Sequence, residues 1–141
     1  MLLTENFDPM ITDFGLTLMK EQARGISQHK GEGTCNYMAP ELFIVNGPLI
    51  TEATDMWSFG CVLIELFGSM IPWAVAKDDH DIGRRVTARG DEAAIVPPEI
   101  ERVPQPAMRA LIRRCMRRAP ADRCTSTEAL AEIEKQIMAL K

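Results

Sequence analysis

Three short stretches of the chain carry side chains whose types and order could do chemistry: ITDFG (11–15), GTCNYMAPE (33–41) and DMWSFG (55–60). Each contains one acidic side chain, whose oxygens can accept hydrogen bonds or bind a hard cation. The middle stretch adds the hydroxyl of Thr34. Each stretch alone is a weak signal, but their order, with a polar loop between the first two, is specific.

The elements before the third stretch are expected to be a hairpin, a loop and a short helix. Residues 1–4 and 10–12 are predicted as two short strands, because turn-forming residues lie between them. Residues 16–33 are polar and contain three glycines, which predicts a loop long enough to be functional. A short helix is expected within residues 37–45, starting after Pro40.

The third stretch opens the central element. Thr54 is predicted to be the N-cap of a helix over residues 55–67, and Gly68 suits its C-terminal end. Apolar residues lie on nearly every side of this helix, so we expect it to be buried on nearly every side.

Further helices are expected in the C-terminal half. Residues 77–90 can form an exposed helix, residues 93–106 are a proline-rich connector, and residues 107–118 have helical apolar spacing. Thr125 and Glu128 form a capping box that opens a last helix. The apolar stripes of these helices comprise Ile82 and Val86; Met108, Leu111, Ile112 and Cys115; and Leu130, Ile133, Ile137 and Leu140.

Composition indicates an ordinary globular domain. The chain has 141 residues, of which 46% are hydrophobic and 26% charged, enough for one domain with one core. A net charge of -4 argues against a nucleic-acid binder that relies on a positive field.

The longest apolar stretch, 61–67, is interrupted by Glu65 and is far short of the ~20 residues of a membrane span. No signal peptide is expected, so the predicted location is the cytoplasm.

The four cysteines are predicted to be free thiols in a reducing compartment. They show no C-x-x-C spacing, and His29 and His80 sit at no ligand-like spacing from any of them, which argues against a zinc site. They are Cys35, Cys61, Cys115 and Cys124.

Read together, the three stretches resemble the eukaryotic protein kinases, and the resemblance covers nearly the whole chain. The matched region is the C-terminal part of the larger lobe, of the serine/threonine type that includes the tyrosine-kinase-like group, because GT precedes YMAPE. The fold it implies is mainly α, with a short β-hairpin, an activation loop and about five helices around a buried central helix. It implies one partial kinase domain over 1–141, with strands in 1–12, an activation segment over 13–41 and a helical subdomain over 42–141.

The resemblance gives roles to the first part of the chain. Asp13 matches the aspartate that holds Mg²⁺ against the ATP phosphates. Phe14 matches the ring whose packing sets the active or inactive state, and Gly15 allows the backbone to turn. Ser27 is the only serine of the activation loop and is either a phosphorylation site or an ordinary polar residue. Thr34 matches the region that positions the substrate hydroxyl.

The resemblance also implies structural roles. Glu41 matches the glutamate that pairs with a buried arginine, which here is Arg123; Cys124 follows it where many kinases have proline. Asp55 matches the aspartate that accepts hydrogen bonds from the backbone of the catalytic loop. Trp57 fits the buried helix.

Two features keep alternative interpretations. Glu65 is either an acid that faces the substrate groove, as in many kinases, or a buried, paired structural acid. The arginines at 109, 113 and 117 form a stripe that is either a phosphate or nucleic-acid patch or a solvated helix face.

The 141 residues hold no glycine-rich loop, no V-A-I-K lysine and no H-R-D-L-x-x-x-N catalytic loop. The resemblance places Met1-Leu2-Leu3 directly after the catalytic-loop asparagine. We therefore expect this polypeptide by itself to lack kinase activity and to bind neither Mg²⁺ nor ATP, although a full-length parent would use both. Its expected partners are a protein substrate or the missing N-terminal kinase part, with no nucleic acid or membrane.

Two functions follow as hypotheses. The first is a partial serine/threonine kinase domain, from a truncated or degenerate kinase-type gene, whose parent transfers the γ-phosphate of ATP to proteins. The second is a catalytically dead, kinase-like scaffold that binds proteins. In either case we expect an exposed apolar surface beside Asp13, since residues that the catalytic loop would cover lose that cover.

Overall fold

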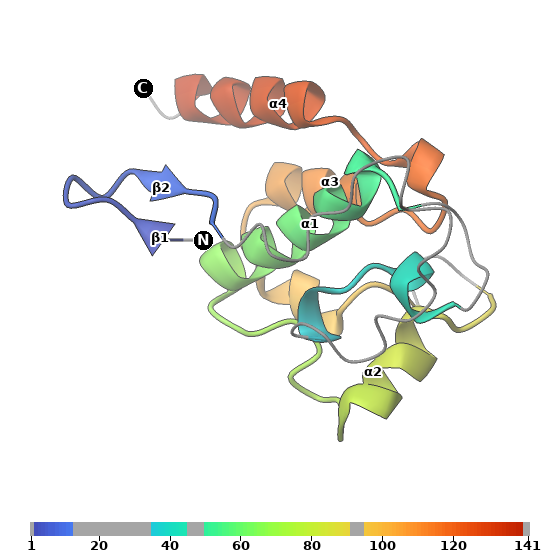
Figure 1. Ribbon diagram of the computed structural model, residues 1–141. Coiled ribbons are helices and arrows are strands. Elements are labelled where there is room, and N and C mark those ends of the chain that lie inside the picture. Colours follow the sequence, from blue (N-terminus) through green and yellow to red (C-terminus); the bar gives the residue numbers. More distant parts are fainter. Residues whose placement is uncertain (1, 13–34, 45–49, 91–94, 140–141) are drawn as a thin grey trace.

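The fold is mainly α, as predicted. The computed structural model describes residues 2–12, 35–44, 50–90 and 95–139, and Figure 1 shows how these segments are arranged. The α-helices within them are α1 (Glu52–Gly68), α2 (Asp79–Val86), α3 (Pro106–Cys115) and α4 (Ser126–Ala139). The strands are β1 (Leu2–Leu3) and β2 (Pro9–Met10), and short 3-10 segments cover Cys35–Tyr37, Pro40–Phe43, Pro98–Arg102 and Pro120–Asp122.

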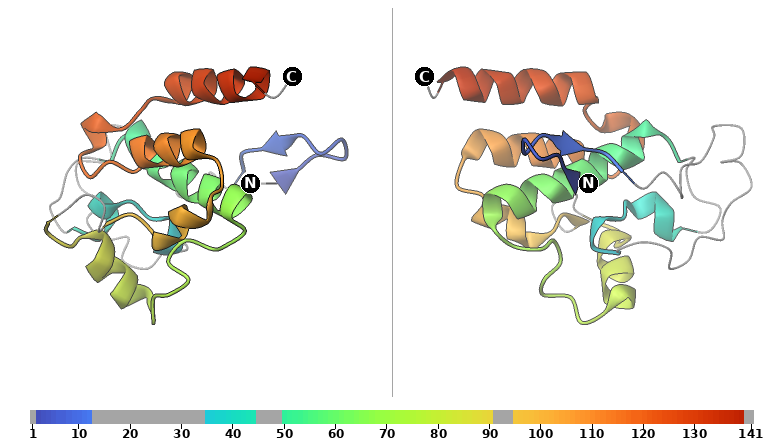
Figure 2. Two further views of the ribbon diagram at one scale, coloured as in Figure 1. Left: turned by 180° about the vertical axis from the view of Figure 1, so that it is seen from behind. Right: turned by 60° about the vertical axis from the view of Figure 1, so that its left-hand side comes forward.

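The strands form an antiparallel hairpin that projects from the helical body (Figures 1 and 2). Leu2 pairs with Met10 and Leu3 with Pro9, so the strands are shorter than predicted and Pro9 belongs to a strand, not to the turn. The turn is closed by Thr4, whose hydroxyl accepts from the Asp8 amide at 3.0 Å. A two-residue ladder is what a hairpin outside the core can sustain.

The central helix α1 begins earlier than predicted. Its N-cap is Thr51, whose hydroxyl accepts from the Ala53 amide at 3.3 Å. Thr54 is the third helical residue and completes a reciprocal capping box, because its hydroxyl accepts from the Thr51 amide at 3.3 Å. The prediction of Thr54 as the cap was wrong because either threonine can cap a helix, and the second one here takes the place usually held by Glu or Gln.

Helix α1 is buried along its first part and not at its end. The buried residues are Thr54, Met56, Trp57, Gly60, Cys61, Leu63 and Ile64. Leu66 is 65% exposed and Phe67 38% exposed, so the expectation of burial on nearly every side is wrong for the last turn. The left-handed residue that ends the helix is Ser69 (φ 55°), and Gly68 is still helical.

Helices α2 and α3 present the predicted residues to the core. Ile82 and Val86 of α2 are buried, as are Met108, Leu111, Ile112 and Cys115 of α3. Both helices are shorter than predicted. The segment predicted as a connector also contributes to the core, because Ile95, Ile100 and Val103 are buried. Prolines therefore interrupt helix formation there without keeping the segment at the surface.

Helix α4 lies along the edge of the body (Figures 1 and 2). Its capping box is confirmed: the Thr125 amide donates to Glu128 Oε2 at 2.7 Å, and the Glu128 amide donates to Thr125 Oγ1 at 3.2 Å. Its apolar face is largely uncovered, since Leu130 is 56% exposed and Ile137 is 51% exposed. Among the described helices, none is long and apolar enough to cross a membrane.

Candidate functional site

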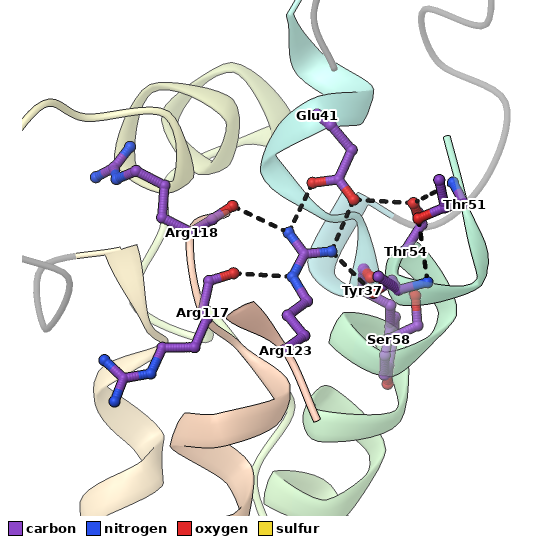
Figure 3. A network of polar contacts seen from close by, with 9 residues as sticks. Tyr37, Glu41, Thr51, Thr54, Ser58, Arg117, Arg118 and Arg123 are labelled. Carbon is purple, nitrogen blue, oxygen red and sulfur yellow. Dashed lines mark hydrogen bonds and ion pairs between the residues drawn. The ribbon is translucent and has the colours of Figure 1, made fainter. Parts of the chain in front are cut away.

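The structure brings together three of the residues singled out from the sequence. Glu41, Trp57 and Arg123 meet at the N-terminal half of α1, whereas Asp55 is exposed on the same helix (Figure 3 shows the polar network around Arg123). The predicted residues Asp13, Phe14, Gly15, Ser27 and Thr34 lie outside the described residues.

Arg123 and Glu41 form a bidentate ion pair, as the sequence analysis predicted. Nη1 of Arg123 donates to Glu41 Oε1 at 2.7 Å, and Nη2 donates to Glu41 Oε2 at 2.8 Å. The two side chains are 0% and 1% exposed. The planar fork of arginine matches a carboxylate in this two-bond arrangement, which lysine cannot reproduce.

The other donors of Arg123 bond to backbone carbonyls from two segments. Nη1 donates to the Ala53 carbonyl at 2.8 Å, and Nε donates to the Arg117 carbonyl at 2.8 Å. Nη2 donates to the Arg118 carbonyl at 3.3 Å. All five N–H groups of the guanidinium therefore have an acceptor, which offsets much of the cost of burying its charge.

Trp57 lies beside this ion pair. The Arg123 guanidinium carbon is 5.3 Å from the centroid of the Trp57 ring, within the range of a cation–π contact. The indole ring is completely buried, and its N–H has no acceptor among the described residues. The role of Trp57 is therefore to pack against the cation and to close the core on that side.

Thr54 connects the ion pair to the start of α1, and the sequence analysis missed this contact. Its hydroxyl donates to Glu41 Oε1 at 2.9 Å while accepting from the Thr51 amide in the capping box (Figure 3). One hydroxyl thus satisfies a backbone donor and a buried carboxylate at the same time. The T-x-x-T spacing could have suggested the capping box, but not the bond to Glu41.

Residues 35–44 are anchored to the helical body at further points. Ser58 Oγ donates to the Tyr37 carbonyl at 2.9 Å, and Asn36 Nδ2 donates to the Pro72 carbonyl at 2.7 Å. Together with Glu41, these bonds fix both ends of the segment. The arrangement can therefore hold a loop in one conformation over α1.

Glu65 is paired but exposed, so the interpretation as a buried structural acid is wrong, whereas a groove-facing acid stays a prediction. It accepts a hydrogen bond from the Tyr37 hydroxyl at 2.6 Å. Partial burial, and then the hydrogen bond and charge of Glu65, raise the pKa of Tyr37 to about 12. Tyr37 therefore remains protonated and keeps donating to Glu65 at neutral pH.

Asp55 is exposed on α1, and its proposed contact with a catalytic loop stays a prediction. Within the described part of the chain, no group donates a hydrogen bond to its carboxylate. Partial desolvation, and then the nearby charge of Glu52, raise the pKa of Asp55 above its ordinary value.

Two arginines of the predicted stripe on α3 bond to neighbouring groups. Arg109 donates to the Val103 carbonyl, and Arg113 pairs with the exposed Glu101. This pairing favours a solvated helix face over a phosphate patch. No group of three or more metal-ligating side chains occurs among the described residues.

Comparison with known proteins gives a consistent result. Residues 1–133 match the protein kinase domain family. The chain is similar to mitogen-activated protein kinase kinase kinase mkh1 of Cytospora mali, with 28% identity over 86% of the chain and 6% of that protein. It is similar to dual specificity protein kinase shkC of Dictyostelium discoideum, with 28% identity over 98% of the chain and 26% of that protein. It also resembles receptor-like cytosolic serine/threonine-protein kinase RBK2 of Arabidopsis thaliana, with 44% identity over 46% of the chain and 14% of that protein.

Proposed function

The chain belongs to the protein kinase domain family, and from this premise we propose that it is the activation segment and helical subdomain of a serine/threonine kinase. The proposed limits are residues 1–12 for the strands, 13–41 for the activation segment and 42–141 for the helical subdomain. The parent protein would transfer the γ-phosphate of ATP to serine or threonine of other proteins in the cytoplasm.

The observation that carries this proposal is the buried Glu41–Arg123 pair. It ties the end of the proposed activation segment to α1 and to the segment before α4. Burying this ion pair costs desolvation free energy, and a scaffold has no need to fix the end of the activation segment at that cost. Phosphoryl transfer does need it, because the reaction depends on precise positioning of the substrate. In this proposal, Thr34 positions the substrate hydroxyl, and Glu41 fixes the backbone that follows it.

Protein kinases use ATP and Mg²⁺, and the proposed metal ligand of this chain is Asp13. One carboxylate supplies at most two of the six oxygens of an octahedron that otherwise consists of phosphates, waters and further protein groups. Asp13 would therefore hold Mg²⁺ only when another part of a kinase presents the phosphates of ATP. The 141-residue polypeptide by itself is proposed to bind neither and to be inactive, because phosphoryl transfer needs several parts acting together.

The first experiment tests activity directly. The purified chain is incubated with radiolabelled Mg-ATP and a mixture of serine- and threonine-containing peptides, beside an intact kinase as positive control. We expect no transfer above background from the chain, whereas transfer that an Asp13→Asn variant loses would contradict inactivity.

Reading the nucleotides upstream of Met1 is the second test, because in-frame codons for a catalytic loop would support the partial-domain proposal over the scaffold.

A second candidate is a protein-binding scaffold, and the uncovered apolar residues of α1 and α4 favour it. Leu66, Leu130 and Ile137 are each more than half exposed. Apolar side chains exposed in one region can mark a binding surface. Fluorescence of a hydrophobic dye on the soluble monomer tests whether these residues form a binding surface. Enhanced fluorescence that falls in a Leu66→Ser/Leu130→Ser variant supports the scaffold, and the absence of enhancement counts against it.

A further inference from the structure

Two cysteines, Cys115 and Cys124, face each other inside the protein. Cys115 is the last residue of α3, and Cys124 follows the 3-10 segment that leads to α4. Their Sγ atoms are 3.4 Å apart. The residues are 0% and 5% exposed, respectively.

The backbone holds the two thiols in this position. The Cys124 amide donates to the Arg114 carbonyl at 3.2 Å, so the chain returns to the end of α3 directly beside Cys115. Arg123, the neighbour of Cys124, binds the carbonyls of Arg117 and Arg118 within the same turn. The closeness of the sulfurs thus follows from a turn that is fixed at several points.

The geometry suits a covalent bond better than a metal. A disulfide has an S–S length of about 2.05 Å, so the sulfurs would need to approach by about 1.4 Å. Small rotations of two side chains can supply that movement. A structural zinc site takes four ligands, and no group of three metal-ligating side chains occurs in the described segments.

We propose that Cys115 and Cys124 are a redox modification site, at which a small-molecule disulfide such as oxidised glutathione converts the two thiols into an intramolecular disulfide. The thiolate of Cys124, the more exposed of the two, attacks one sulfur of oxidised glutathione and releases one reduced glutathione. The Cys115 thiolate then attacks Cys124 Sγ in the mixed disulfide and releases the second glutathione. The two cysteines lose two electrons and two protons, and oxidised glutathione gains them.

The remaining cysteines lack this arrangement. The thiol of Cys61 is directed at the Asn36 carbonyl at 3.6 Å, and burial raises the pKa of both Cys35 and Cys61. Burial also raises the pKa of Cys115 and so lowers its thiolate fraction, which slows any attack by this sulfur. Its position 3.4 Å from Cys124 Sγ favours attack on that sulfur over attack on an external oxidant. The pair should therefore cross-link internally and selectively.

The disulfide would tie α3 to the segment that carries Arg123. It closes a loop of about ten residues, and a constraint of that size restricts the unfolded chain more than the folded one. We expect the midpoint of thermal unfolding to rise by roughly 5–15 °C on oxidation. This inference does not depend on the proposed kinase function.

Peptide mapping of the 141-residue chain tests the site. The folded chain is incubated with oxidised glutathione, alkylated in denaturant and digested with trypsin without reductant. Cleavage after the flanking arginines and lysine yields one peptide of residues 115–117 and one of residues 124–135. We expect these two peptides to be joined and two hydrogens lighter than their sum, with Cys35 and Cys61 alkylated.

The controls separate the pair from general oxidation. Cys61→Ser should keep the linked peptide, whereas Cys115→Ser should lose it and retain glutathione on Cys124. Cys124→Ala serves if the Cys115 variant does not fold. Alkylation of all four cysteines in the oxidised wild-type chain, stable glutathione adducts on both residues, or links spread equally over Cys35 and Cys61 would each overturn the proposal.

Discussion

The hydroxyl of Thr54 donates a hydrogen bond to Glu41 Oε1 across 2.9 Å, and this contact joins the N-terminus of α1 to a buried ion pair. The same oxygen of Glu41 also accepts from Arg123 at 2.7 Å. The start of the central helix, the end of the 35–44 segment and the segment before α4 therefore share one polar network. Each part of the network can be tested separately.

Replacing Arg123 by methionine should destabilise the chain by about 3–5 kcal/mol, because it leaves the carboxylate of Glu41 buried without its counter-ion. Glu41→Gln should act in the same direction. Urea unfolding followed by tryptophan fluorescence measures the change. Arg113→Ala is the matched control, since that arginine is partly exposed and pairs with the exposed Glu101, so its loss should change the free energy of unfolding by no more than about 0.5 kcal/mol. Equal effects of the two arginine replacements would contradict the network.

Thr54→Val should cost about 2 kcal/mol, since it removes both a hydrogen bond to a buried carboxylate and one half of the capping box. Thr51→Ala removes only the other half of the capping box and should cost about 1 kcal/mol. In a double-mutant cycle, Thr54→Val and Glu41→Gln should show a coupling energy of at least about 0.5 kcal/mol. Additive effects would mean that the Thr54–Glu41 bond contributes little.

Tyr37 is the only tyrosine of the chain, so its titration can be followed by tyrosinate absorbance. We expect a midpoint at about 12 in the folded state and a lower midpoint in Glu65→Gln. Because the folded pKa lies above the unfolded value of about 10, the associated stabilisation is complete below pH 10 and is lost as pH rises through 12. An unchanged midpoint in Glu65→Gln would show that burial alone raises the pKa.

Gly60→Ala should destabilise the chain by about 1–3 kcal/mol through overpacking. A Cβ atom at this position would lie 2.8 Å from Met116 Cγ and 3.1 Å from Cys115 Cβ. Gly68→Ala, in the same helix, is the control, because the nearest atom lies at 3.5 Å. That substitution should be neutral or stabilising by up to about 1 kcal/mol, and thermal unfolding of the two variants distinguishes the cases. Equal midpoints would argue against close packing of α1 on α3.

Local pattern was sufficient for the helices whose signals are local. The stripe from Met108 to Cys115 and the capping box of Thr125 and Glu128 depend on residues three or four apart, and both appear in the structure as predicted. The partnership of Glu41 with Arg123 could be predicted only through the kinase resemblance. Spacing alone cannot pair residues that are 82 positions apart.

The sequence by itself determined the mainly helical fold, the family and the start of α4, because helical spacing and capping act within one or two turns. Only the tertiary structure decided which threonine caps α1, which face of α1 stays uncovered and that Cys115 meets Cys124. Each of these depends on which segments pack together in space. Thr54 shows the reason most clearly. Its side chain alone is compatible with an N-cap, but in the folded chain Thr51 is the cap. The Thr54 hydroxyl instead accepts from the Thr51 amide and donates to the carboxylate of Glu41.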